Sequence, residues 1–325
     1  MSQKNVEFST KESVFIQLME NDVHSMWLQR KQNAFSGKDG VQIQWISVTN
    51  PINTRCIVIV NGRNESFWKY QEIFFEFSRQ GYDVYAYDHR GQGASGRLTT
   101  DHELGHVHSF DDYVDDLHTF ITNIVDKERV YQHRFLLAHS MGGAISTLYL
   151  EKYNSQFDAV VLNAPMFGIH MPVPLKLIAS SIAKLMEHYQ HEPSYVLGQR
   201  CYHEEPFENN TVCQSKLRYV WAKNLYQLHP ELRIGGPSPR WLWQAIEAAN
   251  HCIRDVEKIT IPVLLLQAGS DTIVDNNSHL RFCGQNENCH MKIIRNARHE
   301  ILMEKDVIRN QALCETLAFF NQFIV

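Results

Sequence analysis

Long hydrophobic runs are missing from this sequence of 325 residues. The longest apolar stretches, 56–60 and 263–266, fall far short of the roughly 18 residues that a membrane-spanning helix needs. The first residues, from Met1 onwards, contain no apolar segment after a basic start, which argues against a cleaved secretory signal. Together these features predict a cytoplasmic protein without a spanning helix.

Paired cysteine motifs are also missing. The seven cysteines are odd in number and scattered, and no two of them form a C-x-x-C pair. Without a secretory signal, this pattern favours reduced thiols, most of them acting as small core residues. The cysteines are Cys56, Cys201, Cys213, Cys252, Cys283, Cys289 and Cys314.

No block of basic residues stands out that could follow a phosphate backbone. Lys and Arg total 31 against 36 Asp and Glu, for a formal net charge of −5, so we expect no nucleic-acid partner. His102, His106 and His108 cluster, but no carboxylate or cysteine stands at a recognised ligand spacing from them. We interpret them as a solvated loop and expect no metal, no cofactor and no obligate protein partner.

Short β-branched runs alternating with helical segments are what the sequence does contain. This pattern predicts an α/β fold with a mainly parallel sheet covered by helices on both faces. The turn at 37–40 precedes an apolar alternation at 41–45, so we expect the sheet to begin antiparallel. The predicted buried strands are 56–60, 84–87, 135–138, 159–162, 263–267 and 291–294, and the predicted helices include 70–79, 110–125, 143–153 and 306–324.

An interval of about 95 residues, 166–260, separates two predicted strands where one helix would be enough. We expect a helical cap there, over a core made of residues 1–165 and 261–325. The cap aromatics Trp221, Trp241 and Trp243 are candidates for substrate binding, although core packing explains such rings equally well.

An apolar stripe at helical spacing lies within this interval and has two interpretations. We favour packing of the cap onto the core; the alternative is a surface that admits acyl chains or touches a membrane. The stripe consists of Leu175, Ile178, Ile182, Leu185 and Tyr189.

The sharpest signal in the chain is the segment 136–144, where a predicted strand ends at a single serine, Ser140, and glycines open a helix. A nucleophile elbow needs small residues two before and two after the serine, because the strained turn brings strand and helix together. Ala138 and Gly142 meet that need, so the segment predicts a nucleophilic serine.

A serine nucleophile needs a base and an orienting carboxylate, which in this class of fold follow in the order Ser, acid, His. Asp271 comes directly after the strand 263–267, at the edge where active sites of parallel sheets gather. Asp275 is the reserve candidate. Among 17 histidines we select His299, because it follows the strand 291–294 by a short loop, whereas His290 precedes that strand.

The oxyanion hole is expected to use two backbone N–H groups. One belongs to Met141, which follows the nucleophile, and the other lies in the loop after the third strand, 60–66. Gly62 permits a close turn there, so Arg63 is the predicted second donor. We expect the side chains of Arg63 and Glu65 to pair across the loop rather than to take part in the chemistry.

With these motifs in hand, the chain resembles the lysophospholipase L2 family of Gram-negative bacteria, which is close to the monoacylglycerol lipases. The matching blocks are 61–66, 88–96, 138–145 and 297–304. Monoacylglycerol lipases usually have His-Gly in the first block, whereas this chain has Asn61-Gly62 followed by Arg63, which looks more like the lysophospholipase branch.

The resemblance implies an α/β-hydrolase fold and hydrolysis of the remaining acyl ester of a lysophospholipid to a fatty acid and a glycerophosphodiester. It also implies peripheral association with the cytoplasmic face of the inner membrane. The residues alone predict a carboxylic ester hydrolase for an apolar acyl group. Two alternatives are a monoacylglycerol lipase or general carboxylesterase, and an inactive hydrolase-fold binding protein.

Overall fold

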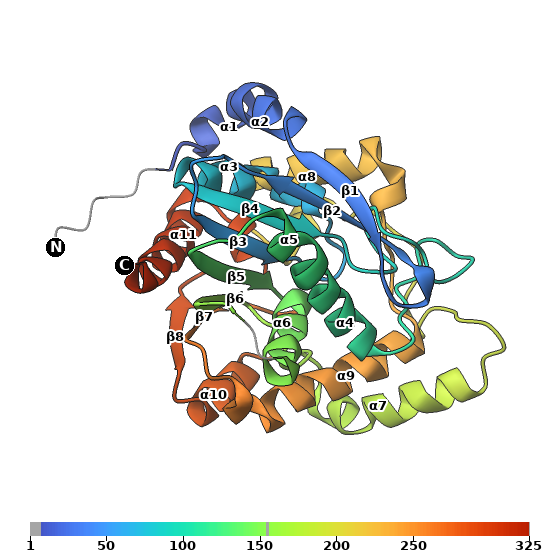
Figure 1. The fold of residues 1–325 in the computed structure, drawn as a ribbon. Helices are drawn as coiled ribbons and strands as arrows, with labels where there is room; N and C mark the ends of the chain where they lie inside the picture. Colours follow the sequence, from blue (N-terminus) through green and yellow to red (C-terminus); the bar gives the residue numbers. More distant parts are fainter. Residues whose placement is uncertain (1–7, 154–155, 325) are drawn as a thin grey trace.

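One eight-stranded sheet forms the centre of the protein (Figure 1). The structure, a computed structural model, describes residues 8–153 and 156–324, including all their side chains except those of 173–177. The strand order is β1-β2-β4-β3-β5-β6-β7-β8. β2 pairs antiparallel with β1 and β4, and every later pairing is parallel, as the sequence predicts.

Each predicted strand is confirmed, and the structure extends it by one to three residues. The antiparallel β1–β2 hairpin turns at 37–40, where Asp39 and Gly40 have positive φ. The strands are β1 (Lys31–Ser36), β2 (Gln42–Val48), β3 (Arg55–Val60), β4 (Tyr82–Tyr87), β5 (His133–His139), β6 (Ala159–Asn163), β7 (Val263–Ala268) and β8 (Cys289–Ile294).

Helices cover both faces of the sheet, because the buried strands are apolar on both sides. Along β3, Ile57 and Ile59 point to the face covered by α2 (His24–Leu28), α3 (Gln71–Arg79) and α11 (Asp306–Phe320). Val58 and Val60 point to the opposite face. That face is covered by α4 (Phe110–Phe120), α6 (Met141–Lys152), α9 (Pro239–Arg254) and α10 (Asn276–Gln285).

Sequence patterns did not predict the two N-terminal helices. α2 belongs to the layer described above, whereas α1 (Phe15–Leu18) packs through Phe15 against Met19, Val23 and Phe75. The short α5 (Asp126–Glu128) ends the helical stretch predicted at 110–125.

Three α-helices lie in the long interval between β6 and β7: α7 (Val173–His188), α8 (Lys216–Leu228) and α9. α9 packs on α6 and contributes Ala245, Ala248 and Cys252 to the core beside the sheet. α7 packs along α9, on the side away from the sheet (Figure 1). The division of the chain into core and cap therefore stays a prediction, with α9 joined to the sheet layer.

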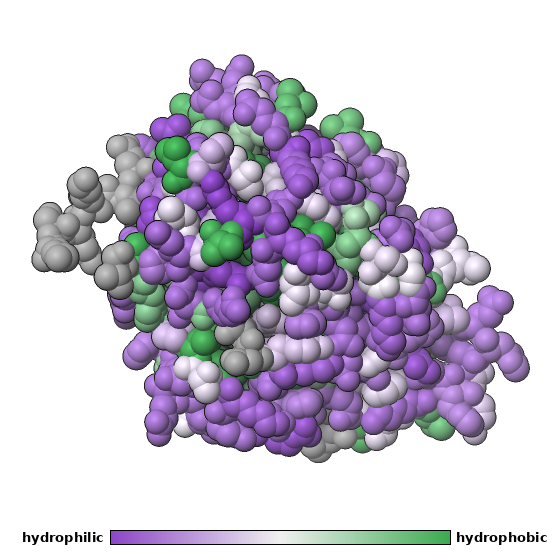
Figure 2. Space-filling model, in the orientation of Figure 1, coloured by the Kyte–Doolittle hydropathy of each residue, from purple (hydrophilic) through white to green (hydrophobic). Residues whose placement is uncertain are grey.

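The apolar stripe of α7 is exposed, so the favoured interpretation of cap-to-core packing is wrong for its described side chains. Ile178, Ile182, Leu185 and Tyr189 are 41–75% exposed, because α7 packs through the small side chains of Ala179 and Ala183 instead. The side chain of Leu175 lies outside the described residues. Figure 2 shows that the face seen in Figure 1 is mainly hydrophilic, with hydrophobic residues in small separate groups.

One cysteine pair corrects the expectation of reduced thiols. Cys283 and Cys289 are joined by a disulfide, because the turn from α10 into β8 brings their Cα atoms to 5.1 Å. Cys56, Cys213 and Cys252 are free and buried, as expected of small core residues, whereas Cys201 and Cys314 are free and exposed. None of the helices in 8–153 and 156–324 has the length and apolar character to cross a membrane.

Candidate active site

Ser140 stands at a strained turn between β5 and α6. Its φ is 52° and its ψ is −118°, a conformation that non-glycine residues rarely adopt. Its amide donates to the Asn163 carbonyl of the neighbouring β6 at 3.0 Å, and its carbonyl accepts from Gly143 and Met166 at 2.9 Å each. These backbone bonds hold the serine at the carboxyl edge of the sheet.

Two residues after the serine only glycine fits, because there is no space for a side chain at this position. A Cβ on Gly142 would lie 2.2 Å from the Val60 carbonyl oxygen and 2.4 Å from that of Asn61. α6 therefore begins in direct contact with the end of β3, which leads into the predicted oxyanion loop. Any side chain at this position would push the elbow away from that loop.

Ser140, His299 and Asp271 form a hydrogen-bonded chain at this edge. The His299 Nε2 atom lies 2.8 Å from the Ser140 Oγ atom, and the His299 Nδ1 atom lies 2.8 Å from the Asp271 Oδ2 atom. With a neutral ring, Nδ1–H donates to Asp271 and Nε2 accepts the serine proton, which is the arrangement a general base needs. Ser140 is 8% exposed and His299 is 6% exposed.

Asp271 is held as a carboxylate by its surroundings. Its Oδ1 atom accepts from the amides of Ile273 and Val274 at 2.8 and 3.2 Å. Burial alone would raise the pKa of Asp271, but hydrogen bonding to His299 and these amides lowers it below its ordinary value. The reserve candidate Asp275 instead caps α10, where its side chain accepts from the Asn277 amide.

The loop after β3 lies against the nucleophile. A Cβ on Gly62 would come within 3.1 Å of the Ser140 Cβ atom. The Gly62 amide is occupied, because it donates to Glu65 Oε2 at 2.5 Å, so the next amide, that of Arg63, stays the proposed donor to an oxyanion. Met141 is the first residue of α6, and its amide has no acceptor within the helix.

The expected ion pair between Arg63 and Glu65 is wrong. The Arg63 guanidinium points away from Glu65, donates to the Gly235 carbonyl at 2.6 Å and lies 4.8 Å from the Trp241 ring centroid. Glu65 turns instead toward the interior beneath the serine. The sequence offered no signal for this separation, because the partners of both side chains come from distant segments.

Asp88 anchors the other end of the oxyanion loop. Its buried carboxylate accepts from the Ser66 hydroxyl at 2.6 Å, and from the amides of Phe67 and Ala94 at 2.7 Å each. Burial raises the pKa of Asp88 to about 6, against the effect of these hydrogen bonds. The sequence block 88–96 thus serves the site indirectly, by fixing the loop that faces Ser140.

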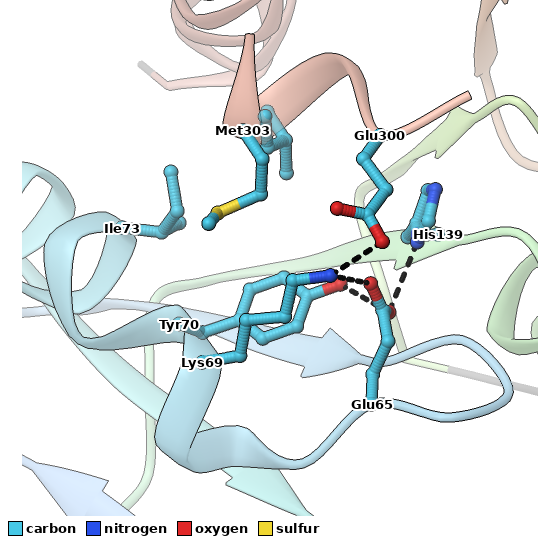
Figure 3. A pocket seen from close by; sticks show the side chains of 8 residues that line it. Glu65, Lys69, Tyr70, Ile73, His139, Glu300 and Met303 are labelled. Carbon is cyan, nitrogen blue, oxygen red and sulfur yellow. Dashed lines mark hydrogen bonds and ion pairs between the residues drawn. The ribbon is translucent and has the colours of Figure 1, made fainter. Parts of the chain in front are cut away.

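A buried charge network that includes His139, the residue before the serine, was missed by sequence reasoning (Figure 3). Lys69 bridges two carboxylates, Glu65 at 3.0 Å and Glu300 at 2.6 Å. Tyr70 donates to Glu65 at 2.7 Å. Since Glu300 directly follows His299, Lys69 ties the oxyanion loop to the loop of the base.

His139 completes this network and is a cation. Its Nδ1 atom lies 3.0 Å from Glu65 Oε2, and its Nε2 atom lies 3.1 Å from the His299 carbonyl oxygen. Both partners are acceptors, so both ring nitrogens must carry protons. Burial is the largest single influence and would lower the pKa of His139, but the charge of Glu65, its hydrogen bond and the charge of Glu300 together raise it. Burial would likewise raise the pKa of Glu65, yet His139 and Lys69 hold it well below its ordinary value.

A cavity of about 820 Å³ opens over Ser140 and His299, within the range of small-molecule sites. Of the three tryptophans predicted as substrate-binding candidates, Trp241 lines it. Trp221 instead packs on Phe15, and Trp243 donates to Glu187, so neither belongs to its lining. Tyr202, Tyr219 and Tyr226 line the cavity beside Lys223 and Arg233. Tyr202 and Tyr219 are among the cap aromatics that the sequence suggested for an acyl tunnel, whereas the two cations were not selected.

The histidine cluster at 102–108 is only partly the solvated loop that we expected. His102 and His108 are exposed, but His106 is 4% exposed and its Nδ1 atom lies 2.8 Å from the Ser238 hydroxyl, because α9 begins against this loop. Burial lowers the pKa of His106 to about 4, so its ring is neutral. In the described part of the chain no group of three or more His, Cys, Asp or Glu could hold a metal ion.

The fold and the Ser–His–Asp arrangement define a serine hydrolase of the α/β-hydrolase class. Comparison with solved structures agrees on the fold: a soluble variant of monoglyceride lipase from Saccharomyces cerevisiae, in complex with a substrate analogue, matches with a TM-score of 0.71 and 17% identity, over 90% of this chain and 96% of that one.

Sequence comparison is more specific. A family model described as serine aminopeptidase, S33, matches residues 52–306. Lysophospholipase L2 from Escherichia coli K12 is 36% identical over 99% of this chain and 96% of its own length. A probable lysophospholipase L2 from Haemophilus influenzae is 34% identical over 88% and 90%. The chain therefore belongs to the S33 family of serine hydrolases and, within it, to the lysophospholipase L2 family.

If Asp271 is the carboxylate that orients His299, substitutions of Asp271 and of the nearby Asp275 should affect ester hydrolysis differently. Asp271→Asn should lower kcat for ester hydrolysis by about ten-thousand-fold, because the wrong His299 tautomer would face Ser140. Asp275→Asn is the matched control and should leave kcat nearly unchanged, since asparagine caps a helix as well as aspartate. Steady-state kinetics on a soluble p-nitrophenyl ester measures both; a larger loss in Asp275→Asn would move the acid to that residue.

The charge network predicts a pH-dependent contribution to stability. Since the folded-state pKa of His139 is raised, its stabilisation is complete below the ordinary histidine value of about 6.5 and is lost as the pH rises through the raised value. We expect the free energy of unfolding of wild type to be higher than that of His139→Gln. This difference should be largest at pH 5–6 and should shrink in alkaline solution. Urea unfolding across this pH range tests it; a difference that grows with pH would refute a charged His139.

Proposed function

We propose that this protein hydrolyses the acyl ester of lysophospholipids, releasing a fatty acid and a glycerophosphodiester. The observation that carries the proposal is the hydrogen-bonded chain from Ser140 through His299 to Asp271, at the floor of a cavity large enough for a lipid. Membership of the lysophospholipase L2 family supports the choice of substrate.

The reaction begins with the base. His299 Nε2 takes the proton of Ser140 as the Oγ atom attacks the ester carbonyl carbon, and Asp271 stabilises the imidazolium that forms. The amides of Met141 and Arg63 donate to the resulting oxyanion, each contributing about 3 kcal/mol. The tetrahedral intermediate then collapses: the glycerol oxygen leaves with the proton from His299, and the acyl group stays on Ser140.

A water molecule completes the cycle. His299 removes a proton from the water as it attacks the acyl-serine carbonyl, and collapse of the second intermediate releases the fatty acid and returns the proton to Ser140. Apolar side chains along the cavity provide surface for the acyl chain. They include Met166, Ile169, Val212, Ala222, Ile234, Trp241, Leu242 and Val274.

Monoacylglycerol hydrolysis is the second candidate, since the same triad serves both esters. The similarity in fold to a yeast monoglyceride lipase supports it. The Asn61-Gly62-Arg63 sequence favours the lysophospholipid, because a cation beside the ester suits a substrate that carries a phosphate.

Turnover of matched substrates tests the proposed function. Ser140→Ala should fold normally and lose nearly all ester hydrolysis, because the nucleophile is gone while the elbow keeps its backbone bonds. Wild-type protein should have a higher kcat/KM for lysophosphatidylethanolamine than for a monoacylglycerol of the same acyl length. Retained hydrolysis in Ser140→Ala would remove the mechanism, and preference for monoacylglycerol would favour the second candidate.

We also propose peripheral contact with the membrane face that holds the substrate. The exposed side chains of Ile178, Ile182, Leu185 and Tyr189 share one face of α7, and an exposed apolar helix face is suited to the interface of a bilayer.

Vesicle sedimentation tests this contact. The double variant Ile182→Glu with Leu185→Glu should bind phospholipid vesicles at least about tenfold more weakly than wild type, because two large apolar side chains no longer enter the interface. Val307→Glu is the control, since Val307 is 84% exposed but lies on α11. Equal binding by all three proteins would exclude α7 as the contact.

A further inference from the structure

The cavity over Ser140 is basic, although the whole chain carries a formal net charge of −5. Five Lys and Arg residues line it against three Glu. Two of those carboxylates, Glu65 and Glu300, are already paired with Lys69. The excess positive charge therefore belongs to the other basic side chains of the lining.

Two of these cations lie over one aromatic ring. The Lys223 ammonium of α8 is 5.7 Å from the Tyr202 ring centroid and 5.1 Å from that of Tyr219. The Arg233 guanidinium is 5.3 Å from the same Tyr202 ring, and its Nε atom donates to the Tyr226 carbonyl at 2.7 Å. Within the residues that the structure describes, neither cation forms an ion pair with a carboxylate.

Arg63 is a third cation without a counter-charge. Its guanidinium contacts the Gly235 carbonyl and the Trp241 ring, but no carboxylate among the described residues pairs with it. Its buried Nε atom has no hydrogen-bond acceptor there either. Burial lowers the pKa of Arg63 to about 10, which still leaves the side chain charged at neutral pH. A charge buried in this way is costly unless a ligand compensates it.

An anion near the scissile ester is the ligand that such a set of cations fits. In a lysophospholipid the phosphodiester is separated from the acyl ester only by the glycerol unit, and it is ionised at all physiological pH values. In a monoacylglycerol a neutral hydroxyl takes its place. Guanidinium and ammonium groups bind phosphate oxygens through charge-assisted hydrogen bonds.

We propose that Lys223, Arg233 and Arg63 form a phosphate subsite that binds the headgroup phosphodiester while the acyl ester lies against Ser140. The inference rests on the proposed function and adds to it the residues that distinguish a lysophospholipid from a monoacylglycerol. The rings of Tyr202 and Trp241 fix the positions of the cations within the cavity lining, so the subsite is formed before the substrate arrives.

The ratio of kcat/KM for lysophosphatidylethanolamine to kcat/KM for a monoacylglycerol of equal acyl length tests the subsite. Lys223→Gln should lower this ratio about tenfold or more, since a charge-assisted contact to phosphate is lost. Lys223→Arg should restore much of it, and Arg233→Gln should lower it. Lys216→Gln, on the same helix but outside the cavity, is the control and should keep the wild-type ratio.

The outcomes separate the subsite from the proposed function. A wild-type preference for lysophospholipid that persists unchanged in folded Lys223→Gln and Arg233→Gln would overturn the subsite alone. A wild-type preference for monoacylglycerol would overturn both. Inorganic phosphate, added during monoacylglycerol hydrolysis, distinguishes a headgroup from a free anion: strong inhibition without any lysophospholipid preference would assign the cations to the free ion and overturn the subsite.

Discussion

The close contact between the start of α6 and the end of β3 is the constraint on which the site depends. Ser140 keeps its strained backbone because hydrogen bonds to β6 and the following loop hold it, and because Gly142 lets the helix touch the carbonyls of Val60 and Asn61. That contact sets the nucleophile beside the loop whose amides face the reacting carbonyl. The nucleophile elbow and the oxyanion loop therefore hold each other in position.

The charges beneath the serine extend this unit to the base. Lys69 and the imidazolium of His139 both reach from Glu65 of the oxyanion loop to the loop of His299, one through Glu300 and the other through the His299 carbonyl. Buried charges are stable only when geometry and partners are nearly complete. The oxyanion loop, the turn at His139 and Ser140, and the loop of His299 are therefore held in register by these paired charges.

The sequence was sufficient for the sheet, for the approximate positions of its strands and for the positions of Ser140 and His299. Each of these follows from a local pattern: an apolar run, a small-residue turn, or a residue just after a strand. The sequence was insufficient where the position of a side chain depends on contacts with distant segments of the chain. The lining cations and the turn of Arg63 away from Glu65 depend on tertiary packing. The Cys283–Cys289 disulfide is local, but it carries no C-x-x-C spacing that would have marked it. The stripe on α7 was found but misread, since periodicity identifies a face without saying what covers it.

The order of segments along the chain has a consequence for biosynthesis. Ser140 and the oxyanion loop leave the ribosome early, but β7 can pair with β6 only after the whole excursion through α7, α8 and α9 has been synthesised. His299 and the helix α11 that covers its side of the sheet come last. Closing so long a loop before non-local contacts form slows folding. A nascent chain therefore carries its nucleophile for about half of translation without the base that activates it, and becomes reactive only as the final helix folds.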